Sequence, residues 1–347
     1  MDKLKVLMIG PGRDVMGGIS TVVNKYYEAK LDDKVDLKYI ATMEDGSKLK
    51  KLFVAISAYM KFCRSISKYD IIHVHMASRN SYERKKVFIN KAFKSHKKVI
   101  IHLHGSEFHM FYDKECSKEK QKEVRNIFSK ADKVIVLSEE WKDYISKLCD
   151  PKNIEVVHNS VVISGTKSEM DNHNILFLGR LGTRKGVYDL LDCMEDIVKQ
   201  VPNVKLYLAG DGEIENCRTI IEKRNLENNV ELCGWISGDQ KKEYMKKCAI
   251  FVLPSYNEGM PMSLLEAMAY GMAVVTSNVG GIPQIMKGDC GIMLDPGDID
   301  KMKQSLLELL TDKDRKQQLG TNAFKVINDR FNLDKNILKV ISIYQSI

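Results

Sequence analysis

Long uninterrupted apolar runs are missing from this sequence, and so are internal repeats and low-complexity segments. A helix that crosses a bilayer needs about 18 or more apolar residues. The first apolar stretch, Lys5–Gly10, is far shorter and ends in a glycine turn, which is typical of a β-strand rather than of a signal peptide. The sequence therefore predicts a soluble, cytoplasmic protein.

Close cysteine pairs are missing as well. The chain has eight cysteines, but no two of them show the C-x-x-C spacing of zinc-binding and redox motifs. Several lie in apolar stretches, so we expect buried, unpaired thiols in a reducing compartment. A basic motif interleaved with aromatic residues is also lacking, which argues against a nucleic-acid partner.

The order of the apolar segments predicts two α/β domains, since 347 residues are many for one hydrophobic core. Short apolar runs alternate with helical patterns in two blocks, which predicts two doubly wound, Rossmann-like domains facing each other across a cleft. We expect domains over residues 1–163 and 174–328, a polar linker over 164–173, a final helix over 329–347, and one long helical tail from Asp312 to Ile347. The expected strands are Lys5–Gly10, Ile71–His75, Val99–His104 and Lys133–Leu137, then Asn174–Gly179, Lys205–Gly210, Val230–Leu232, Ala249–Leu253, Ala273–Thr276 and Gly291–Leu294.

Positive charge is concentrated in the first half of the chain. Residues 1–160 carry 31 Lys and Arg against 21 Asp and Glu, whereas the remainder carries 23 against 25. The segment 48–98 is the most basic part, with 14 basic and 2 acidic residues. Two predicted helices, Ser47–Lys68 and Ser81–Ser95, hold most of this charge.

These basic helices have two interpretations. On the first helix, an apolar stripe recurs at helical spacing and is expected to pack in the core; it consists of Leu49, Leu52, Phe53, Ile56, Tyr59 and Met60. The second helix carries Arg84, Lys85, Lys86, Lys91 and Lys94. The basic side chains either attract an anionic membrane surface or form an ordinary solvated face.

Two glutamates lie eight positions apart in the segment from Pro254 to Gly271. Pro261 is suited to the first turn of a helix, so we expect Glu258 in the loop before that helix and Glu266 on its second turn. The preceding apolar run is typical of a buried parallel strand, and ligands of open α/β sheets bind at the carboxyl ends of such strands. Both carboxylates could bind hydroxyl groups there, although the spacing alone fits ordinary solvated glutamates better.

Two glycine-containing loops have features of phosphate sites. The loop from Gly179 to Gly186 follows a predicted strand, so Arg180 and Lys185 lie at the carboxyl edge of the second sheet, where they can bind a diphosphate. Gly17 and Gly18 open a predicted helix, whose free N–H groups attract anions. The glycine spacing differs from the dinucleotide fingerprint. We interpret Arg184 as a solvated charge.

Histidines cluster in the first half of the chain, where His73 and His75 end one predicted strand and His102 and His104 end another. Each pair points to one face of the sheet. A zinc site is one reading of this pattern. Buried histidines bonded to the backbone explain it better, because no acidic or cysteine ligand accompanies them at ligand spacing.

Together these segments resemble the motifs of the retaining glycosyltransferases of family 4, which have the GT-B fold, and the resemblance extends over most of the chain. The matching positions are Glu258 and Glu266, the pairs Gly179-Arg180 and Lys185-Gly186, the loop of Gly17 and Gly18, and His104-Gly105-Ser106-Glu107. The resemblance implies that His104 hydrogen-bonds the transferred sugar. Glu107 could orient the acceptor or act as a proton acceptor. The resemblance also implies that the final helix crosses back to the first domain.

The resemblance further implies a nucleotide-sugar site in the second domain. There Arg180 and Lys185 bind the diphosphate, Glu258 the sugar and Glu266 the ribose. The implied catalytic residues are His104, Arg180, Lys185 and Glu258. The implied donor-binding residues are Gly17, Gly18, Arg180, Lys185, Gly210, Trp235, Ile236, Glu258, Gly259, Met260, Pro261, Leu265 and Glu266. For Trp235, a place in the core explains the residue almost as well.

The implied reaction is transfer of a sugar, with retention of configuration, from a nucleoside-diphosphate sugar, for which we expect UDP, to a glycan or lipid-linked acceptor in polysaccharide biosynthesis. No cofactor or metal is expected, because Arg180 and Lys185 supply positive charge and no Asp-x-Asp triplet ends a strand. Such an enzyme would be cytoplasmic or peripheral on the inner face of the membrane. Two alternatives stay open: an epimerase or hydrolase of nucleotide sugars with this architecture, and a non-catalytic nucleotide-sugar-binding subunit.

Overall fold

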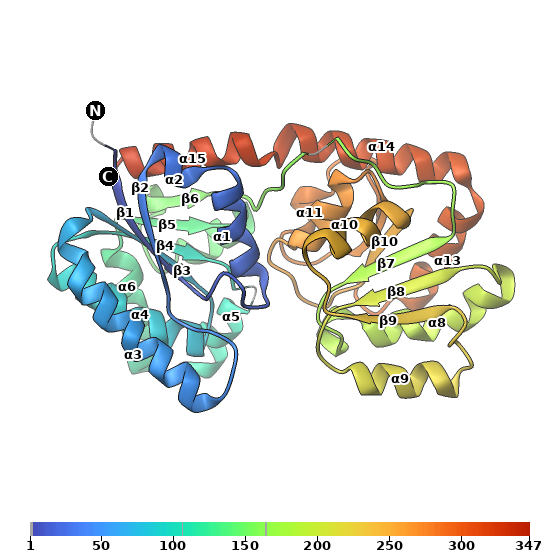
Figure 1. Cartoon of the computed structure of the whole chain (residues 1–347), viewed down its shortest axis with the longest axis horizontal. Coiled ribbons are helices and arrows are strands. Elements are labelled where there is room, and N and C mark those ends of the chain that lie inside the picture. Colours follow the sequence, from blue (N-terminus) through green and yellow to red (C-terminus); the bar gives the residue numbers. More distant parts are fainter. Residues whose placement is uncertain (1–2, 106, 164) are drawn as a thin grey trace. The chain divides into compact units, whose positions relative to one another are not determined.

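The computed structural model describes residues 3–105, 107–163 and 165–347 (Figure 1). Ser106 of the predicted sugar-site motif and Ser164 of the predicted linker lie outside the described residues. The chain divides into two compact units: unit 1 comprises Met1–Ser160 with Leu333–Ile347, and unit 2 comprises Val161–Asn332. The finer boundaries expected from the sequence, at residues 163, 174 and 329, stay predictions.

Unit 1 is built on a parallel sheet of six strands in the order β2-β1-β3-β4-β5-β6. The strands are β1 Lys5–Gly10, β2 Asp36–Ala41, β3 Ile71–Met76, β4 Lys98–Leu103, β5 Lys133–Val136 and β6 Ile154–Val156. The α-helices are α1 Gly18–Glu28, α2 Leu31–Lys34, α3 Lys48–Ser65, α4 Asn80–Lys94, α5 Phe108–Met110, α6 Lys118–Lys130, α7 Glu139–Ile145 and α15 Leu333–Gln345. Short 3₁₀ or π segments are η1 Ile66–Lys68, η2 Phe111–Glu115 and η3 Pro151–Asn153.

Unit 2 contains a second parallel sheet, in the order β12-β11-β10-β7-β8-β9. Its strands are β7 Asn174–Leu178, β8 Lys205–Ala209, β9 Val230–Gly234, β10 Ile250–Leu253, β11 Ala273–Ser277 and β12 Ile292–Leu294. Its helices are η4 Thr183–Lys185, α8 Val187–Gln200, α9 Ile214–Lys223, α10 Gly238–Lys247, α11 Met262–Ala269, α12 Ile282–Ile285, α13 Ile299–Thr311 and α14 Lys313–Arg330.

Both strand orders have a switch point, where consecutive connections run to opposite sides. In unit 1 it lies between β1 and β3, and in unit 2 between β7 and β10. A doubly wound sheet opens a crevice at the carboxyl ends of the strands at such a point, and ligands bind there. The predicted doubly wound α/β class is therefore confirmed for both units, and their topology marks where each site belongs.

Strand β2 is absent from the set expected from sequence, and its position at the sheet edge explains this. An edge strand does not need the continuous apolar run of a central parallel strand. In β2 only Ile40 is fully buried, whereas Asp36 and Lys38 are exposed. Short apolar runs therefore identify the central strands and miss this one. The short strand β6 at the opposite edge is likewise absent from the expected set.

The helical tail is divided into two helices. α14 ends at Arg330, and α15 begins at Leu333 after the buried residue Phe331. The tail from Asp312 to Ile347 is therefore helical over most of its length, as predicted, and it consists of two helices. The division separates the units, because α14 belongs to unit 2 and α15 packs in unit 1.

The apolar stripe expected to pack in the core from α3 is mostly on the surface. Leu49, Leu52, Phe53, Ile56 and Met60 are all exposed, and only Tyr59 packs against the core. The helix instead uses its opposite side, with Ala58, Phe62 and Ser65, to pack on the unit. This corrects the sequence-based expectation. Across the described residues, every helix is too short or too polar to span a membrane.

Lys85 corrects a second expectation about the basic surface. Its side chain is buried, with only 1% exposed, and its ammonium group donates to the hydroxyl of Thr42. Burial, with a smaller contribution from Arg84, lowers the pKa of Lys85 to about 7. Lys86 is held by Glu83 at 2.8 Å and by Glu123 at 3.2 Å. Two of the five basic residues predicted to form the surface of α4 are therefore not free surface charges.

The cysteines agree with the expectation of unpaired thiols. All eight are free, and Cys149, Cys193, Cys217, Cys248 and Cys290 are buried. Desolvation raises the pKa of the buried thiols, for example to about 12 for Cys193, so they stay protonated at neutral pH.

Candidate active site

The strongest constellation of polar residues lies at the switch point of unit 2. The loop after β7 carries Arg180 and Lys185, and the loop after β10 carries Glu258. Because β7 and β10 are neighbours in the sheet, these loops leave the same edge side by side. The predicted placement at the carboxyl edge is therefore confirmed for these three residues.

Glu258 is the buried acid of this edge. Its side chain is only 7% exposed and its Oε1 atom accepts hydrogen bonds from Ser255, at 2.7 Å, and from Lys185. A buried carboxylate needs such partners, because an unpaired one would lose its solvation without compensation. The contacts fix both Lys185 and Glu258 in orientation before any ligand binds.

Close backbone approaches hold this loop in place. Gly280 has φ 54°, and a Cβ atom at this position would collide with the carbonyl oxygen of Glu258. The amide of Gly281 donates to the carbonyl of Gly259 at 2.7 Å. A side chain at residue 280 would therefore displace the loop that carries the buried acid.

Arg184 supports the same loop from the other side. Its guanidinium donates to the carbonyl of Asn257 at 3.1 Å, and its own carbonyl accepts from the amide of Tyr256 at 2.9 Å. The interpretation of Arg184 as an unassigned solvated charge is therefore incomplete, since the residue is exposed but connects the two loops.

Arg180 is exposed at this edge, in contrast to Lys185. The next residue, Leu181, donates its amide to the carbonyl of Asp211 at 2.6 Å, which ties the loop after β7 to the turn after β8. In that turn, Gly210 donates its amide to Gly234 at 2.8 Å. These bonds hold the backbone around Arg180, and its exposed guanidinium is accessible to an anion.

Glu266 lies one helical turn inside α11, as predicted. Its Oε1 atom accepts from Lys241 of α10 at 2.8 Å, and its side chain is 12% exposed. Pro261 differs from the expectation, because it is the N-cap of α11 with an extended backbone and not a residue of the first turn. The spacing argument survives, since Met262 begins the helix and Glu266 falls on its second turn.

The other predicted donor-binding residues of unit 2 divide into exposed and buried groups. Trp235 follows β9 directly and is 48% exposed, so the alternative that it is an ordinary core residue is wrong. Ile236, Met260 and Leu265 are buried, as are Gly259 and Pro261. Leu265 therefore contributes packing below the loop rather than an exposed contact.

In unit 1, Gly17 and Gly18 lie in the loop between β1 and α1. Gly17 caps α1 with φ 150°, no side chain caps the helix, and a Cβ atom at either glycine would meet only open space. The first amides of α1 therefore point out from a bare helix end, which favours an anion.

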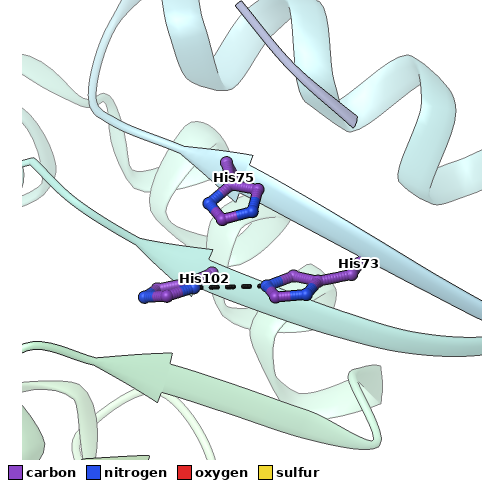
Figure 2. A group of neighbouring side chains, drawn as sticks. All are labelled: His73, His75 and His102. Carbon is purple, nitrogen blue, oxygen red and sulfur yellow. Dashed lines mark hydrogen bonds between the residues drawn. The ribbon is translucent and has the colours of Figure 1, made fainter. Parts of the chain in front are cut away.

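The histidines of β3 and β4 form one stack of neutral rings. Figure 2 shows His73 and His75 from β3 beside His102 from β4, with a hydrogen bond of 3.2 Å between His73 Nε2 and His102 Nδ1. His104 joins through a 2.8 Å contact between its Nε2 and His75 Nδ1. Desolvation lowers the pKa of His73 and of His104 to about 3, so these imidazoles are uncharged at neutral pH.

A metal ion is conceivable in this stack on distance alone. His73, His75 and His102 each offer a ring nitrogen, and these atoms lie within 4.8 Å of one another. However, His73 already bonds the hydroxyl of Tyr344 at 2.6 Å as well as His102. A divalent ion would also be buried here with no carboxylate or thiolate to balance it. We therefore assign these three histidines a structural role. The hydrogen bonds of their rings go to side chains, namely other histidines and Tyr344, so the expectation that they bond to the backbone is wrong.

Glu107, which the resemblance connects with the acceptor, is engaged by Arg79. The Arg79 guanidinium contacts Glu107 and also holds Glu115 at 2.5 Å. Arg79 has a positive φ of 53°, which is uncommon for a residue with a side chain. These ion pairs join Glu107 and Glu115 through Arg79 and occupy the carboxylate of Glu107.

Several site residues are absent from the sequence-based set: Ser255, Lys241, Arg184, Gly280 and Arg79. The pair Gly280-Gly281 after β11 is of the same type as the glycine loops considered in the sequence analysis, so the sequence offers a signal for it. Lys241 could not, because it is one of several lysines on a polar helix and its partner is 25 positions away.

Family models match nearly the whole chain. Residues 25–164 match "Glycosyltransferase Family 4", and residues 163–326 match "Glycosyl transferases group 1". The chain therefore belongs to the family 4 glycosyltransferases. It is an enzyme of the retaining, GT-B class.

Individual relatives agree with this assignment. An uncharacterized glycosyltransferase of Methanocaldococcus jannaschii is 29% identical over 219 residues, which cover 62% of this chain and 60% of that protein. The match thus spans less than two thirds of that relative. The UDP-Gal:alpha-D-GlcNAc-diphosphoundecaprenol alpha-1,3-galactosyltransferase of Escherichia coli is 25% identical over 344 residues, covering 90% of this chain and 84% of that enzyme.

The fold has a close counterpart among solved structures. HepE from Anabaena, in complex with UDP-glucose, superposes with a TM-score of 0.80 over 99% of this chain and 100% of that one, at 19% sequence identity. This likeness confirms the predicted GT-B fold.

Proposed function

We propose that this enzyme transfers a sugar from a UDP-sugar to a glycan or a lipid-linked sugar in the biosynthesis of a surface polysaccharide. The observation that carries the proposal is the pair of Lys185 and Glu258 at the switch point of unit 2, beside the exposed Arg180. This edge offers two cations for a diphosphate and a fixed carboxylate for sugar hydroxyls.

In the proposed reaction, Arg180 and Lys185 stabilise the leaving diphosphate as the glycosidic bond breaks. Glu258 binds hydroxyls of the donor sugar, and Glu266 binds the ribose, with Lys241 fixing its carboxylate. The exposed ring of Trp235 lies beside the base. Ile236 and the loop of Gly259 to Pro261 complete the donor site, with Leu265 packed below it.

Unit 1 contributes the remaining proposed contacts. The amides behind Gly17 and Gly18 meet the donor phosphate, and His104 hydrogen-bonds the transferred sugar. Because His104 is neutral, it can donate or accept one hydrogen bond without placing a charge beside the reacting carbon. No metal or cofactor is part of the proposal, since Arg180 and Lys185 supply the positive charge.

The choice of UDP and of a lipid-linked acceptor draws support from two proteins. The E. coli relative is named for a UDP-sugar donor and a diphosphoundecaprenol acceptor, and HepE was crystallised with UDP-glucose. A lipid-linked acceptor would bring the enzyme to the inner face of the membrane, where the basic helices α3 and α4 of unit 1 can meet anionic headgroups.

A panel of nucleotide sugars tests the proposal. The full chain is heated with UDP-, GDP- or ADP-sugars in buffer containing EDTA, and unfolding is followed by fluorescence. A UDP-sugar at 100 times its dissociation constant should stabilise the protein by about 2.7 kcal/mol, and the other donors should not.

The control is Arg218→Ala, which removes an exposed arginine of unit 2 that pairs with Glu215 at 3.4 Å. This variant should respond like the wild type. Stabilisation by no UDP-sugar, or only after a divalent metal is restored, would contradict the proposal. Conversion of the donor to an epimer without acceptor would favour the epimerase alternative instead.

A further inference from the structure

The most prominent surface feature that the proposed reaction does not use is an apolar face on α3. We call it the α3 face; it consists of Leu49, Leu52, Phe53, Ile56 and Met60. Leu49 is 80% exposed and Phe53 74%, and none of the five is less than 47% exposed. Their spacing of three, four and seven positions places them along one side of the helix.

This face is not needed for folding of the helix onto unit 1. The side that packs carries Ala58, Phe62 and Ser65, and the ring of Phe62 meets Phe88 of α4 at 5.2 Å between centroids. Figure 1 shows the helices α3 and α4 side by side. The first ten residues of α3, 48–57, include no buried side chain. A contiguous apolar surface of this kind marks an interaction site, whereas single exposed apolar residues do not.

The charges around the face indicate the chemistry of its partner. The segment 47–68 carries six basic residues and no acidic one. Lys50 contacts Glu44 at 3.5 Å, but Lys48, Lys51, Lys61 and Arg64 form no ion pair within the part of the chain that the structure describes. Large apolar side chains on one side of a helix with lysine and arginine around them are typical of helices that lie in the interface of an anionic membrane.

We propose that α3 lies in the plane of an anionic lipid bilayer, with the α3 face inserted among the acyl chains and its basic residues at the headgroups. This inference adds detail to the membrane contact of the proposed function. It rests on the proposed function only for the purpose of the contact, which is the approach to a lipid-linked acceptor. It also moves the main contact from α4 to α3, because Lys85 is buried and Lys86 is already paired with glutamates.

The test is co-sedimentation of the full chain with vesicles of phosphatidylcholine alone or mixed with phosphatidylglycerol. The mixed vesicles should bind the protein, and raised salt should weaken the binding without abolishing it, because salt screens the charges and leaves the apolar contact. Replacement of Leu49, Phe53 and Ile56 by serine should weaken binding about tenfold or more.

The matched control is Leu338→Ser, which removes a leucine that is 59% exposed on α15 of the same unit. It should bind vesicles like the wild type. A second readout is Phe53→Trp, whose fluorescence should shift to the blue on mixed vesicles, whereas the emission of Leu338→Trp should stay unchanged.

Three outcomes would overturn the inference: no binding to mixed vesicles, unchanged binding of the triple serine variant, or complete release by salt. A dimer that forms without lipid and is lost in the triple variant would show instead that the face joins two copies. Donor stabilisation is measured in the same samples. Donor stabilisation without vesicle binding contradicts only the membrane inference. Vesicle binding without donor stabilisation contradicts only the proposed function.

Discussion

The two units handle charge near the carboxyl ends of their strands in opposite ways. Unit 2 brings cations and carboxylates together, with Lys185 on Glu258 and Lys241 on Glu266. Unit 1 places four histidines on β3 and β4 and directly after β4, and burial keeps them neutral. Two sheets of similar construction thus present very different chemistry at their strand ends.

The difference follows from what each edge has to bind in the proposed reaction. A diphosphate gains charge as it leaves, so fixed cations stabilise the transition state more than the bound donor. In the free enzyme, the carboxylate of Glu258 holds the Lys185 ammonium in place. A neutral imidazole instead offers directed hydrogen bonds to hydroxyls and leaves the local field unchanged.

The largest effect is expected from Arg180→Ala. Loss of a cation at the leaving diphosphate should reduce the transfer rate by about 10²- to 10³-fold. Arg180 is exposed, so the unfolding temperature should stay close to that of the wild type. Near-normal turnover would refute the role of this edge.

Lys185→Ala should be equally inactive but also less stable. Unlike the exposed Arg180, the side chain of Lys185 is only 13% exposed and partners the buried Glu258. Its removal leaves a buried carboxylate unpaired, which is costly. A thermal melt beside the transfer assay distinguishes the two variants, and an equally stable Lys185→Ala protein would contradict this difference.

These contrasts show which features of the site can be predicted from the sequence. The spacing of Glu258 and Glu266 gives their loop and helix positions, and the strand-loop pattern gives the edge on which Arg180 and Lys185 lie. Partners such as Lys241 depend on how distant helices pack, which no local pattern records. The residue types at strand ends can therefore be predicted from the sequence, whereas the contacts that hold their side chains cannot.

Helical patterns show a related limit. The period of the apolar residues on α3 predicts a helix correctly, but the period cannot tell whether its apolar side packs on the protein or faces outward. For Lys85 a local signal did exist, since Tyr82, Ile89 and Ala92 lie at helical spacing from it and are buried like it. A lysine within such a stripe is a candidate for burial.

An intermediate effect should separate the two glutamates of unit 2. Glu266→Gln should weaken binding of free UDP about tenfold by removing a charged acceptor for the ribose hydroxyls. Glu258→Gln should leave UDP affinity nearly unchanged and lower the transfer rate. Calorimetric titration with UDP, beside a transfer assay, measures both. Equal loss of UDP affinity in the two variants would remove the division of roles.

The smallest effect concerns the neutral histidines of unit 1. The folded pKa of His73 is about 3, well below the usual value of 6.5, because burial disfavours the charged ring. Between these two pH values the unfolded chain binds more protons than the folded one, so stability is complete above about pH 6.5 and falls as the pH drops toward 3. His73→Asn keeps an acceptor near Tyr344 and removes one such titration. Its unfolding temperature should therefore fall less between pH 7.5 and pH 5 than that of the wild type.

The control is His96→Asn, at an exposed position, which should follow the wild-type profile. An unchanged slope in His73→Asn would show that the stack does not set the acid sensitivity of unit 1.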